Sequence, residues 1–409
     1  MNQEILDKAT ALIELTDNKI CNHCLGRKFS TLVEGNGNVD RGLKIRKLLN
    51  IEDYNPEDGC YVCNNLFLKI DEDLIGKIKD KIEFLNLEFY NFLIGTKVTK
   101  ELLERDSQID ESLDFDVENI KKEINRELGK ILESEFEKEA EFENNDIVIM
   151  VDFRKEEIKV RIQINPIFIE GKYNKFKRGI PQTKWPCRKC KGKGCEYCNF
   201  TGKMYEESVE ELLSETVLKY SNGRSCKFHG AGREDIDVLM LGDGRNFVLE
   251  IVEPKIRHLN LEKIENEANK ASEGKTKYNN LKFTYRNRKA EIKVSSPDTF
   301  KIYKAIVECG EKYDEKKLKD LKTLKTIEQR TPIRVSHRRA DKIRTKEVIN
   351  LETEIIDEKT FEMTVKTQGG LYIKELISGD EERTQPNVSK ILEVPCLCKQ
   401  LDVVGLSEK

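Results

Sequence analysis

Residues 229–251 read HGAGREDIDVLMLGDGRNFVLEI. Two apolar-rich runs, 235–241 and 246–252, flank the triplet Gly-Asp-Gly, and this arrangement is typical of a β-hairpin. We therefore expect two antiparallel strands here. Three acids, Glu234, Asp235 and Asp237, stand directly after an arginine at the start of this stretch. They fit a solvated surface turn as well as a loop that presents one carboxylate to a substrate.

Strand and helix patterns continue beyond this stretch. Alternating apolar residues predict further strands, and two segments have the apolar spacing of a helix. The expected strands are 291–296, 300–309, 347–357 and 361–368, and the expected helices are 261–274 and 372–378. From about residue 206 the chain thus predicts a mixed α/β domain with a largely antiparallel sheet.

The first part of the chain predicts a different module. Helical patterns cover 1–20, 72–105 and 117–142, and alternating runs at 146–153 and 157–173 predict strands. The third helix carries one apolar face, made of Ile120, Ile124, Leu128, Ile131 and Phe136. Helices followed by strands suit an RNA-binding module, so we expect an α+β protein. We divide it into an accessory domain (1–175), a basic linker (176–205) and a second domain (206–409).

The composition predicts a soluble globular protein. Charged residues make up 36% of the chain and aromatic residues 7%. No apolar run approaches the roughly 20 residues that a membrane-spanning helix needs. The acidic, amphipathic N-terminus does not resemble a secretory signal. We therefore expect a cytoplasmic protein that has no membrane partner.

Two basic stretches stand out from a net charge of −3. Residues 170–194 contain nine Lys and Arg against one Glu, and residues 330–346 contain seven against one Asp. Such clusters indicate a local track for a polyanion, of which nucleic acid is the usual one. Two solvated surfaces would have the same composition.

Eight of the twelve cysteines form four Cys-x-x-Cys units. This spacing lets two thiolates bind one tetrahedral zinc ion, and it is rare in secreted disulfide frameworks. We expect two structural zinc sites, with redox-active pairs as the alternative. Their ligands would be Cys21, Cys24, Cys60 and Cys63 in the first site and Cys187, Cys190, Cys195 and Cys198 in the second. The other four, Cys226, Cys309, Cys396 and Cys398, follow no such pattern and are expected to be core or incidental thiols.

Nucleotide-cofactor motifs are absent from the sequence. It contains no Gly-x-x-x-x-Gly-Lys-Ser/Thr phosphate loop and no strand–Gly-x-Gly-x-x-Gly–helix unit. We therefore expect no organic cofactor.

Three separate stretches resemble pseudouridine synthases, in the order that this family requires. GREDIDV (232–238) resembles the loop with the catalytic aspartate, FKIYKAIVECG (300–310) the strand with the active-site tyrosine, and TQGGLYIKELI (367–377) the segment with a basic partner. Together with the cysteine pairs and RTPIRVSHRR (330–339), they resemble the archaeal and eukaryotic tRNA pseudouridine synthases that act on uridines 54 and 55 of the T arm. That family pairs a THUMP-containing N-terminal domain with a synthase domain, and the resemblance covers most of the chain from Cys21 onward.

The resemblance implies a role for each matching residue. Asp235 would be the catalytic carboxylate, acting as nucleophile or as base, and Lys374 would hold it ionised. Tyr303 would stack on the target base. In an extended loop Glu234 points away from Asp235, whereas Asp237 shares its face and is its main rival.

The substrate implied by the resemblance is tRNA, whose target uridine must leave its stack. The implied contacts come from the basic stretches and the active-site segments: Lys172, Arg178, Arg233, Arg334, Arg338, Arg339 and Tyr372, with Tyr372 serving in packing as the alternative. The stretch 170–194 offers further cations, among them Lys175, Lys177, Arg188 and Lys189. His337 would be a loop or RNA-contact residue. We expect a monomer that needs no protein partner.

Two alternatives to a synthase stay open. One is a non-catalytic, zinc-stabilised RNA-binding protein that keeps the same fold. The other is a different THUMP-linked enzyme, a methyltransferase or a thiolase, although the missing cofactor and phosphate loops argue against both.

Overall fold

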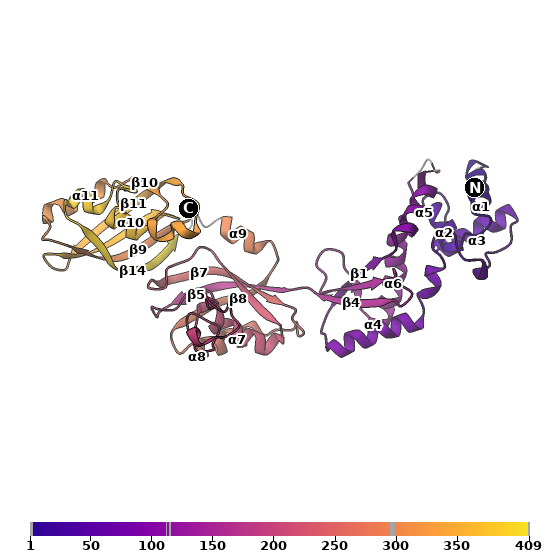
Figure 1. Ribbon diagram of the computed structural model, residues 1–409, viewed down its shortest axis with the longest axis horizontal. Coiled ribbons are helices and arrows are strands. Elements are labelled where there is room, and N and C mark those ends of the chain that lie inside the picture. Colours follow the sequence, from indigo (N-terminus) through magenta and orange to yellow (C-terminus); the bar gives the residue numbers. More distant parts are fainter. Residues whose placement is uncertain (1–2, 112, 114–115, 295–298, 408–409) are drawn as a thin grey trace. The chain divides into compact units, whose positions relative to one another are not determined.

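The chain forms two compact units, residues 1–165 and 166–409, in a computed structural model (Figure 1). The structure describes residues 3–111, 113, 116–294 and 299–407. The strand β5 (Ile167–Lys175) belongs to the second unit because it pairs with strands on both sides there. The expected boundary after residue 175 therefore lies ten residues beyond the structural one. The division into three functional parts stays a prediction.

The first unit contains a sheet in the order β2-β1-β3-β4. β1 is parallel to both β2 and β3, and β4 is antiparallel to β3. The strands are β1 (Asn91–Lys97), β2 (Glu139–Ala140), β3 (Ile147–Asp152) and β4 (Lys159–Ile164). Their core-facing residues alternate with exposed ones along β1 and β3, as a sheet covered on one face requires.

Helices make up most of the rest of this unit. They are α1 (Gln3–Leu15), α2 (Asn22–Lys28), α3 (Asn38–Leu49), α4 (Glu72–Leu85), α5 (Lys100–Glu111) and α6 (Ile120–Phe136), with short 3-10 helices at Pro56–Asp58 and Leu66–Lys69. The single helix expected over 72–105 is wrong, because β1 interrupts it. On α6 the buried face contains Ile120, Ile124 and Leu128 as predicted, but Leu132 takes the place expected for Ile131, which is exposed.

The described part of the second unit contains a ten-stranded sheet in the order β13-β10-β11-β12-β9-β14-β7-β5-β8, with β6 beside β7. All neighbours are antiparallel except β7 and β14, which are joined in parallel by two residue pairs. Besides β5, its strands are β6 (Ser225–Gly230), β7 (Leu239–Val252), β8 (Thr276–Thr284), β9 (Phe300–Cys309), β10 (Thr326–Arg330), β11 (Ile343–Ile355), β12 (Thr360–Gln368), β13 (Thr384–Gln385) and β14 (Cys396–Ser407). This confirms the mixed, largely antiparallel sheet.

Helices cover both faces of this sheet (Figure 1). On one face α7 (Val209–Ser221), α8 (Leu261–Ala271), α10 (Ile373–Ser378) and α11 (Val388–Leu392) contribute to one continuous apolar core. On the other face α9 (Arg288–Val294) packs Ile292 against Phe168 and Val248. Short 3-10 helices lie at Glu196–Cys198, Glu315–Thr323 and Ile333–Arg338. In the described residues no helix is both long and apolar enough to cross a membrane.

The hairpin expected within 229–251 is wrong, because β7 runs through the Gly-Asp-Gly triplet as one strand. On the partner strand Tyr173 pairs with Arg245 and Lys175 with Met240, so the residues between form a bulge. Gly242 and Gly244 have positive φ there, at 61° and 78°. Glycines with positive φ suit a bulge as well as a hairpin turn, which explains the error.

Two other strand predictions are also wrong. Residues 288–294 form the helix α9, where a strand over 291–296 was expected, and 295–296 lie outside the described residues. The continuous strand expected over 157–173 divides at Asn165-Pro166 into β4 and β5, which belong to different sheets. A proline lacks the N–H that a ladder needs, which explains the break. The strands β9, β11 and β12 and the helices α8 and α10 match their predicted positions.

We predict that Gly242→Ala destabilises the protein more than Gly274→Ala does. Both glycines have positive φ, where an L side chain costs about 1–2 kcal/mol. A Cβ at Gly242 would also lie 2.3 Å from the carbonyl oxygen of Val404, whereas a Cβ at Gly274 meets nothing within 4 Å. Urea unfolding of both variants measures the difference, and equal losses would contradict a close contact between the bulge and β14.

Candidate functional site

A cavity of about 520 Å³ opens beside the loop that joins β6 to β7. This loop contributes one wall, the 3-10 helix Ile333–Arg338 and the start of α10 contribute another, and the segment before the second cysteine group contributes a third. The lining residues are Gln182, Trp185, Arg233, Glu234, Asp235, Ile236, Asp237, Arg334, Val335, Arg339, Tyr372 and Lys374. Segments distant in sequence thus bring three acids and four cations to one cavity.

Asp235 lies between two cations in this cavity. Its Oδ2 is 2.9 Å from Nη1 of Arg334 and 3.6 Å from Nζ of Lys374, and about a third of its side chain is exposed. The sequence motifs predicted the approach of Lys374. They did not predict that Arg334, assigned to substrate contact, would be the nearer partner of Asp235.

Arg334 is held in place by its own contacts. Its Nε donates to Oε1 of Glu375 at 2.6 Å, and its guanidinium lies 5.8 Å from the ring centre of Tyr372. Glu375 is buried on α10, one residue after Lys374. One short helix therefore supplies Lys374 directly and orients Arg334 through its carboxylate.

Asp237 takes the shorter contact with Lys374, at 2.7 Å. Burial raises the pKa of this carboxyl, but the hydrogen bond from Lys374 outweighs burial, so the pKa is lowered overall. Its side chain is 65% exposed, about twice the exposure of Asp235. Asp237 therefore lies nearer to solvent than its rival.

Tyr303 and Lys301 lie on the face of β9 that is continuous with the core. Burial raises the pKa of the Tyr303 hydroxyl to about 12, the charges of Glu234 and Asp235 add to this, and Arg245 opposes it. Burial lowers the pKa of Lys301 to about 7, assisted by Arg245. The tyrosine expected near Asp235 is thus close enough to respond to its charge, and it is protonated at neutral pH.

A buried polar network lies directly beneath the cavity. The carboxylate of Glu234 accepts hydrogen bonds from the Tyr173 hydroxyl at 2.8 and 2.9 Å and lies 3.0 Å from Nε of Arg245. Gln182 donates to the Tyr173 oxygen at 2.7 Å and to the carbonyl of Gly232 at 3.0 Å. Glu234 points into the protein while Asp235 points into the cavity, as the alternation of an extended loop predicts.

Two basic residues hold the backbone of the same loop. Lys175 is fully buried, and its Nζ donates to the carbonyls of Ile180 and Asp235 at 3.0 and 3.1 Å. The prediction that Lys175 is available to a phosphate is therefore wrong. Arg178 donates to the carbonyl of Asp237 at 2.6 Å and pairs with Asp402 at 2.6 Å.

The other predicted contact residues are spread more widely. Arg233, Arg339 and Tyr372 line the cavity with Asp235. Lys172 lines a different cavity of about 410 Å³, beside Glu170 and Arg288. The side chain of Arg338 lies outside the described part of the chain.

Sequence reasoning assigned no role in the site to Glu234, Arg245, Glu375, Gln182 or Trp185. The alternation of inward and outward residues along β7 places Arg245 on the same face as buried Phe247, so an arginine there already indicated a buried partner. Trp185 is the only tryptophan in the chain. Its position inside the basic stretch 170–194 was the signal for a nucleic-acid contact.

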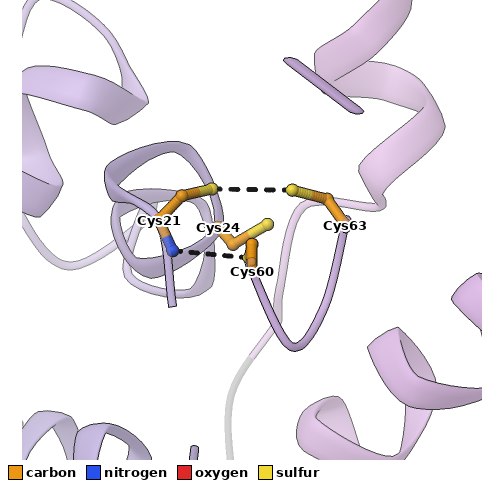
Figure 2. A group of neighbouring side chains, drawn as sticks. All are labelled: Cys21, Cys24, Cys60 and Cys63. Atoms are coloured by element: carbon orange, nitrogen blue, oxygen red, sulfur yellow. Dashed lines mark hydrogen bonds between the residues drawn. The ribbon is translucent and has the colours of Figure 1, made fainter. Parts of the chain in front are cut away.

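The first cysteine group assembles as expected (Figure 2). Sγ of Cys21 lies 3.6 Å from Sγ of Cys63, the amide of Cys21 donates to Sγ of Cys60 at 3.4 Å, and all four ligand atoms lie within 4.8 Å of one another. Cys21 and Cys24 come from the start of α2, and the other two from a loop. Buried ion pairs join α2 to α5 and α6: Arg27 contacts Asp106 at 2.8 Å and Glu123 at 3.0 Å.

The second cysteine group is equally compact. Sγ of Cys187 lies 3.9 Å from that of Cys195, and Sγ of Cys190 lies 3.9 Å from that of Cys198. Backbone amides of Gly194 and Gly202 donate to these sulfurs at 3.2 Å. Amide donors and four converging thiols suit a metal ion, so both groups can hold one. Of the other thiols, Cys309 and Cys396 belong to the core, and Cys226 and Cys398 pack against it.

Family models match both units. Residues 168–407 match the model described as "Pus10, C-terminal", and residues 76–152 match "Pus10 THUMP domain, archaeal". The chain is 49% identical over 405 residues to the curated protein tRNA pseudouridine synthase Pus10 of Methanothermobacter marburgensis, with 99% of each chain covered. It is 42% identical to the protein of that name from Methanocaldococcus jannaschii, with 100% of this chain and 98% of the relative covered. The chain therefore belongs to the Pus10 family, which confirms the family indicated by its motifs.

A solved structure gives a weaker likeness. One chain of a Cbf5–Nop10–Gar1 complex is similar at 16% identity and a TM-score of 0.29, over 48% of this chain and 45% of that one. So slight a likeness supports no conclusion about this protein.

We predict that Glu234→Gln lowers the free energy of unfolding by about 3 kcal/mol, because it leaves Arg245 charged, buried and without its counter-ion. Asp243→Asn is the matched control, since it removes an exposed carboxylate nine residues away and should change stability by less than about 0.5 kcal/mol. Chemical denaturation of the two variants tests this. A Glu234 variant as stable as the control would contradict a supporting role for the network.

Proposed function

We propose that this protein is a tRNA pseudouridine synthase that isomerises uridines 54 and 55 in the T arm, with Asp235 as the catalytic carboxylate. The observation that carries the proposal is the position of Asp235 in a cavity, within 4 Å of Arg334 and Lys374. The names of the close relatives and the order of the three motifs support the same activity.

The reaction breaks the C1′–N1 bond of uridine, turns the base and joins C1′ to C5, from which a proton is then removed. It therefore needs a carboxylate beside the sugar, as nucleophile or base, and no outside reactant. Arg334 and Lys374 pair with the Asp235 carboxylate in the cavity, at 2.9 and 3.6 Å. Tyr303, whose pKa of about 12 leaves it protonated, would stack on the base.

The cavity walls support binding of an extruded nucleotide. A flipped base costs a few kcal/mol of lost stacking, which contacts to the backbone must offset. Arg339 on the cavity rim and the exposed cations of 330–346 supply positive charge beside Asp235. The THUMP-matching segment would contact the tRNA elsewhere. Action as a monomer in the cytoplasm stays a prediction.

We infer that both cysteine groups bind zinc. Four thiolates in a tetrahedral set match structural zinc sites, and a set without His or a carboxylate leaves no position for a reactive water. Zinc would thus stabilise α2 in the first unit and the loop of 187–198 in the second.

Asp235→Asn should reduce pseudouridine formation by at least about 10²–10⁴-fold, because the carboxylate takes part in bond making or proton transfer. Asp237→Asn is the matched control, since this acid shares the loop and the Lys374 contact, and it should cost about tenfold or less. Unmodified tRNA transcript is incubated with each protein and mapped by carbodiimide primer-extension stops.

Three outcomes would contradict this assignment. Loss of activity with Asp237→Asn alone would move the catalytic role to Asp237. Wild-type stops outside the T loop would contradict the proposed positions. Tight tRNA binding by the wild type without any stops would favour a non-catalytic RNA-binding protein.

Metal analysis should find two zinc ions per chain, one of which is lost in Cys24→Ser and the other in Cys190→Ser. Structural zinc contributes directly to folding, so each loss should lower the melting temperature. Cys226→Ser, a partly buried thiol outside both groups, should keep both ions. Fewer than two ions in wild type purified without chelators, or unchanged metal content in both ligand variants, would count against zinc.

A further inference from the structure

The cavity has an aromatic wall that the chemistry at Asp235 does not use. Trp185 lines it, and the guanidinium carbon of Arg233 lies 5.2 Å from the centre of the Trp185 ring system. At this distance the guanidinium is attracted to the face of the indole, and the pair combines an aromatic ring with a positive charge.

Trp185 is anchored by its neighbours. The amide of Met204 donates to the carbonyl of Trp185 at 2.9 Å, and Pro186 forms a β-bridge with Lys203. The ring of Tyr205 meets that of Trp185 edge-on, at 5.4 Å and 81°. The loop with the second cysteine group begins two residues after Trp185, so that its two ends close at the tryptophan.

The pair is also tied to the catalytic loop. Gln182 donates to the carbonyl of Gly232, which joins the segment before Trp185 to the residue before Arg233. Arg233 in turn stands two residues before Asp235, a distance of about 7 Å in extended chain. The stacked pair and the catalytic carboxylate are therefore held at neighbouring positions of one cavity.

Planar, cationic surfaces of this kind take nucleobases. Bases of single-stranded RNA stack on aromatic rings and on arginine planes, and stacking tolerates any base. The reacting uridine must occupy the Asp235 end of the cavity. A ligand at the Trp185 end is therefore another nucleotide of the same strand.

We propose that Trp185 and Arg233 form a stacking shelf for the base of a nucleotide adjacent to the reacting uridine. The identity of the RNA in this proposal rests on the proposed function, whereas stacking on the shelf does not depend on catalysis. The shelf holds the strand on one side of the uridine while Asp235 acts on its ribose. Since the cysteine loop closes at Trp185, the second metal site shapes this part of the substrate site.

The single tryptophan makes the shelf directly observable. An RNA stem-loop with the T-arm sequence is titrated into wild type and into Asp235→Ala while tryptophan fluorescence and filter binding are measured in parallel. We expect quenching that saturates together with binding in both proteins. Replacing one loop nucleotide next to the target by an abasic ribose should remove the quenching, whereas the same change at the target itself should leave most of it.

Variants separate stacking from charge and from folding. Trp185→Ala should weaken RNA binding by about 5- to 150-fold, and Trp185→Phe by less than about threefold. Arg233→Lys keeps the positive charge but loses the planar guanidinium, so its loss of RNA affinity should lie between the losses in Trp185→Ala and Trp185→Phe. Tyr197→Ala is the matched control, because Tyr197 is an exposed aromatic residue of the same loop, lies beneath Lys189 at 4.5 Å and does not line the cavity.

The outcomes distinguish the shelf from the synthase activity. Saturated RNA binding without quenching, or equal losses in Trp185→Ala and Tyr197→Ala, would overturn the shelf while leaving turnover by the wild type intact. Quenching that disappears only when the target base itself is removed would assign the surface to the uridine and overturn the neighbouring-base proposal. Quenching and the abasic effect without any pseudouridine formation would keep the shelf and contradict the synthase.

Discussion

The contact between Glu234 and Arg245 sets the geometry of everything around it. Both side chains are buried, their charged atoms are 3.0 Å apart, and the Tyr173 hydroxyl completes the carboxylate's shell. The loop cannot slide by one residue without leaving a buried charge unpaired, and that costs several kcal/mol. Because successive residues of an extended chain point to opposite sides, burial of Glu234 forces Asp235 into the cavity. The carboxylate proposed to react is thus positioned by its neighbour.

The cavity lies where two halves of one sheet meet. β7 and β14 join through only two parallel residue pairs, and Asp402 strengthens this seam by accepting from the amide of Leu239 at 3.2 Å and pairing with Arg178. The loop with Asp235 comes from one half, and α10 with Lys374 comes from the other. Because the carboxylate and its cations come from separate halves, a small movement of either half changes the distance between them. Partners on one strand would keep a fixed distance.

Sequence alone predicted the parts of this architecture that depend on local pattern. The alternation of β9 and β12 placed those strands correctly, and the motifs predicted the approach of Lys374 to Asp235, whose Nζ and Oδ2 lie 3.6 Å apart. It could not predict that Glu234 meets Arg245 or that Arg334 reaches Asp235, because those contacts depend on the pairing of distant segments. The hairpin error has a physical source as well: Gly242 and Gly244 permit a bulge and a turn equally, and only the partner strand β5 decides between them.

Many cations of the two basic stretches are engaged in contacts within the protein. Of their cations, Lys175 is buried under the loop, Arg178 binds Asp402, Arg334 binds Asp235 and Arg330 binds Asp341 at 2.5 Å. These four side chains hold the site together, and a phosphate could recruit them only by breaking those contacts. Electrostatic attraction of RNA then falls to the exposed cations, such as Arg188 and Lys189 beside the second cysteine group. Because these lie close in sequence to Trp185, charge and stacking would act on the same stretch of the RNA strand, next to the carboxylate that reacts.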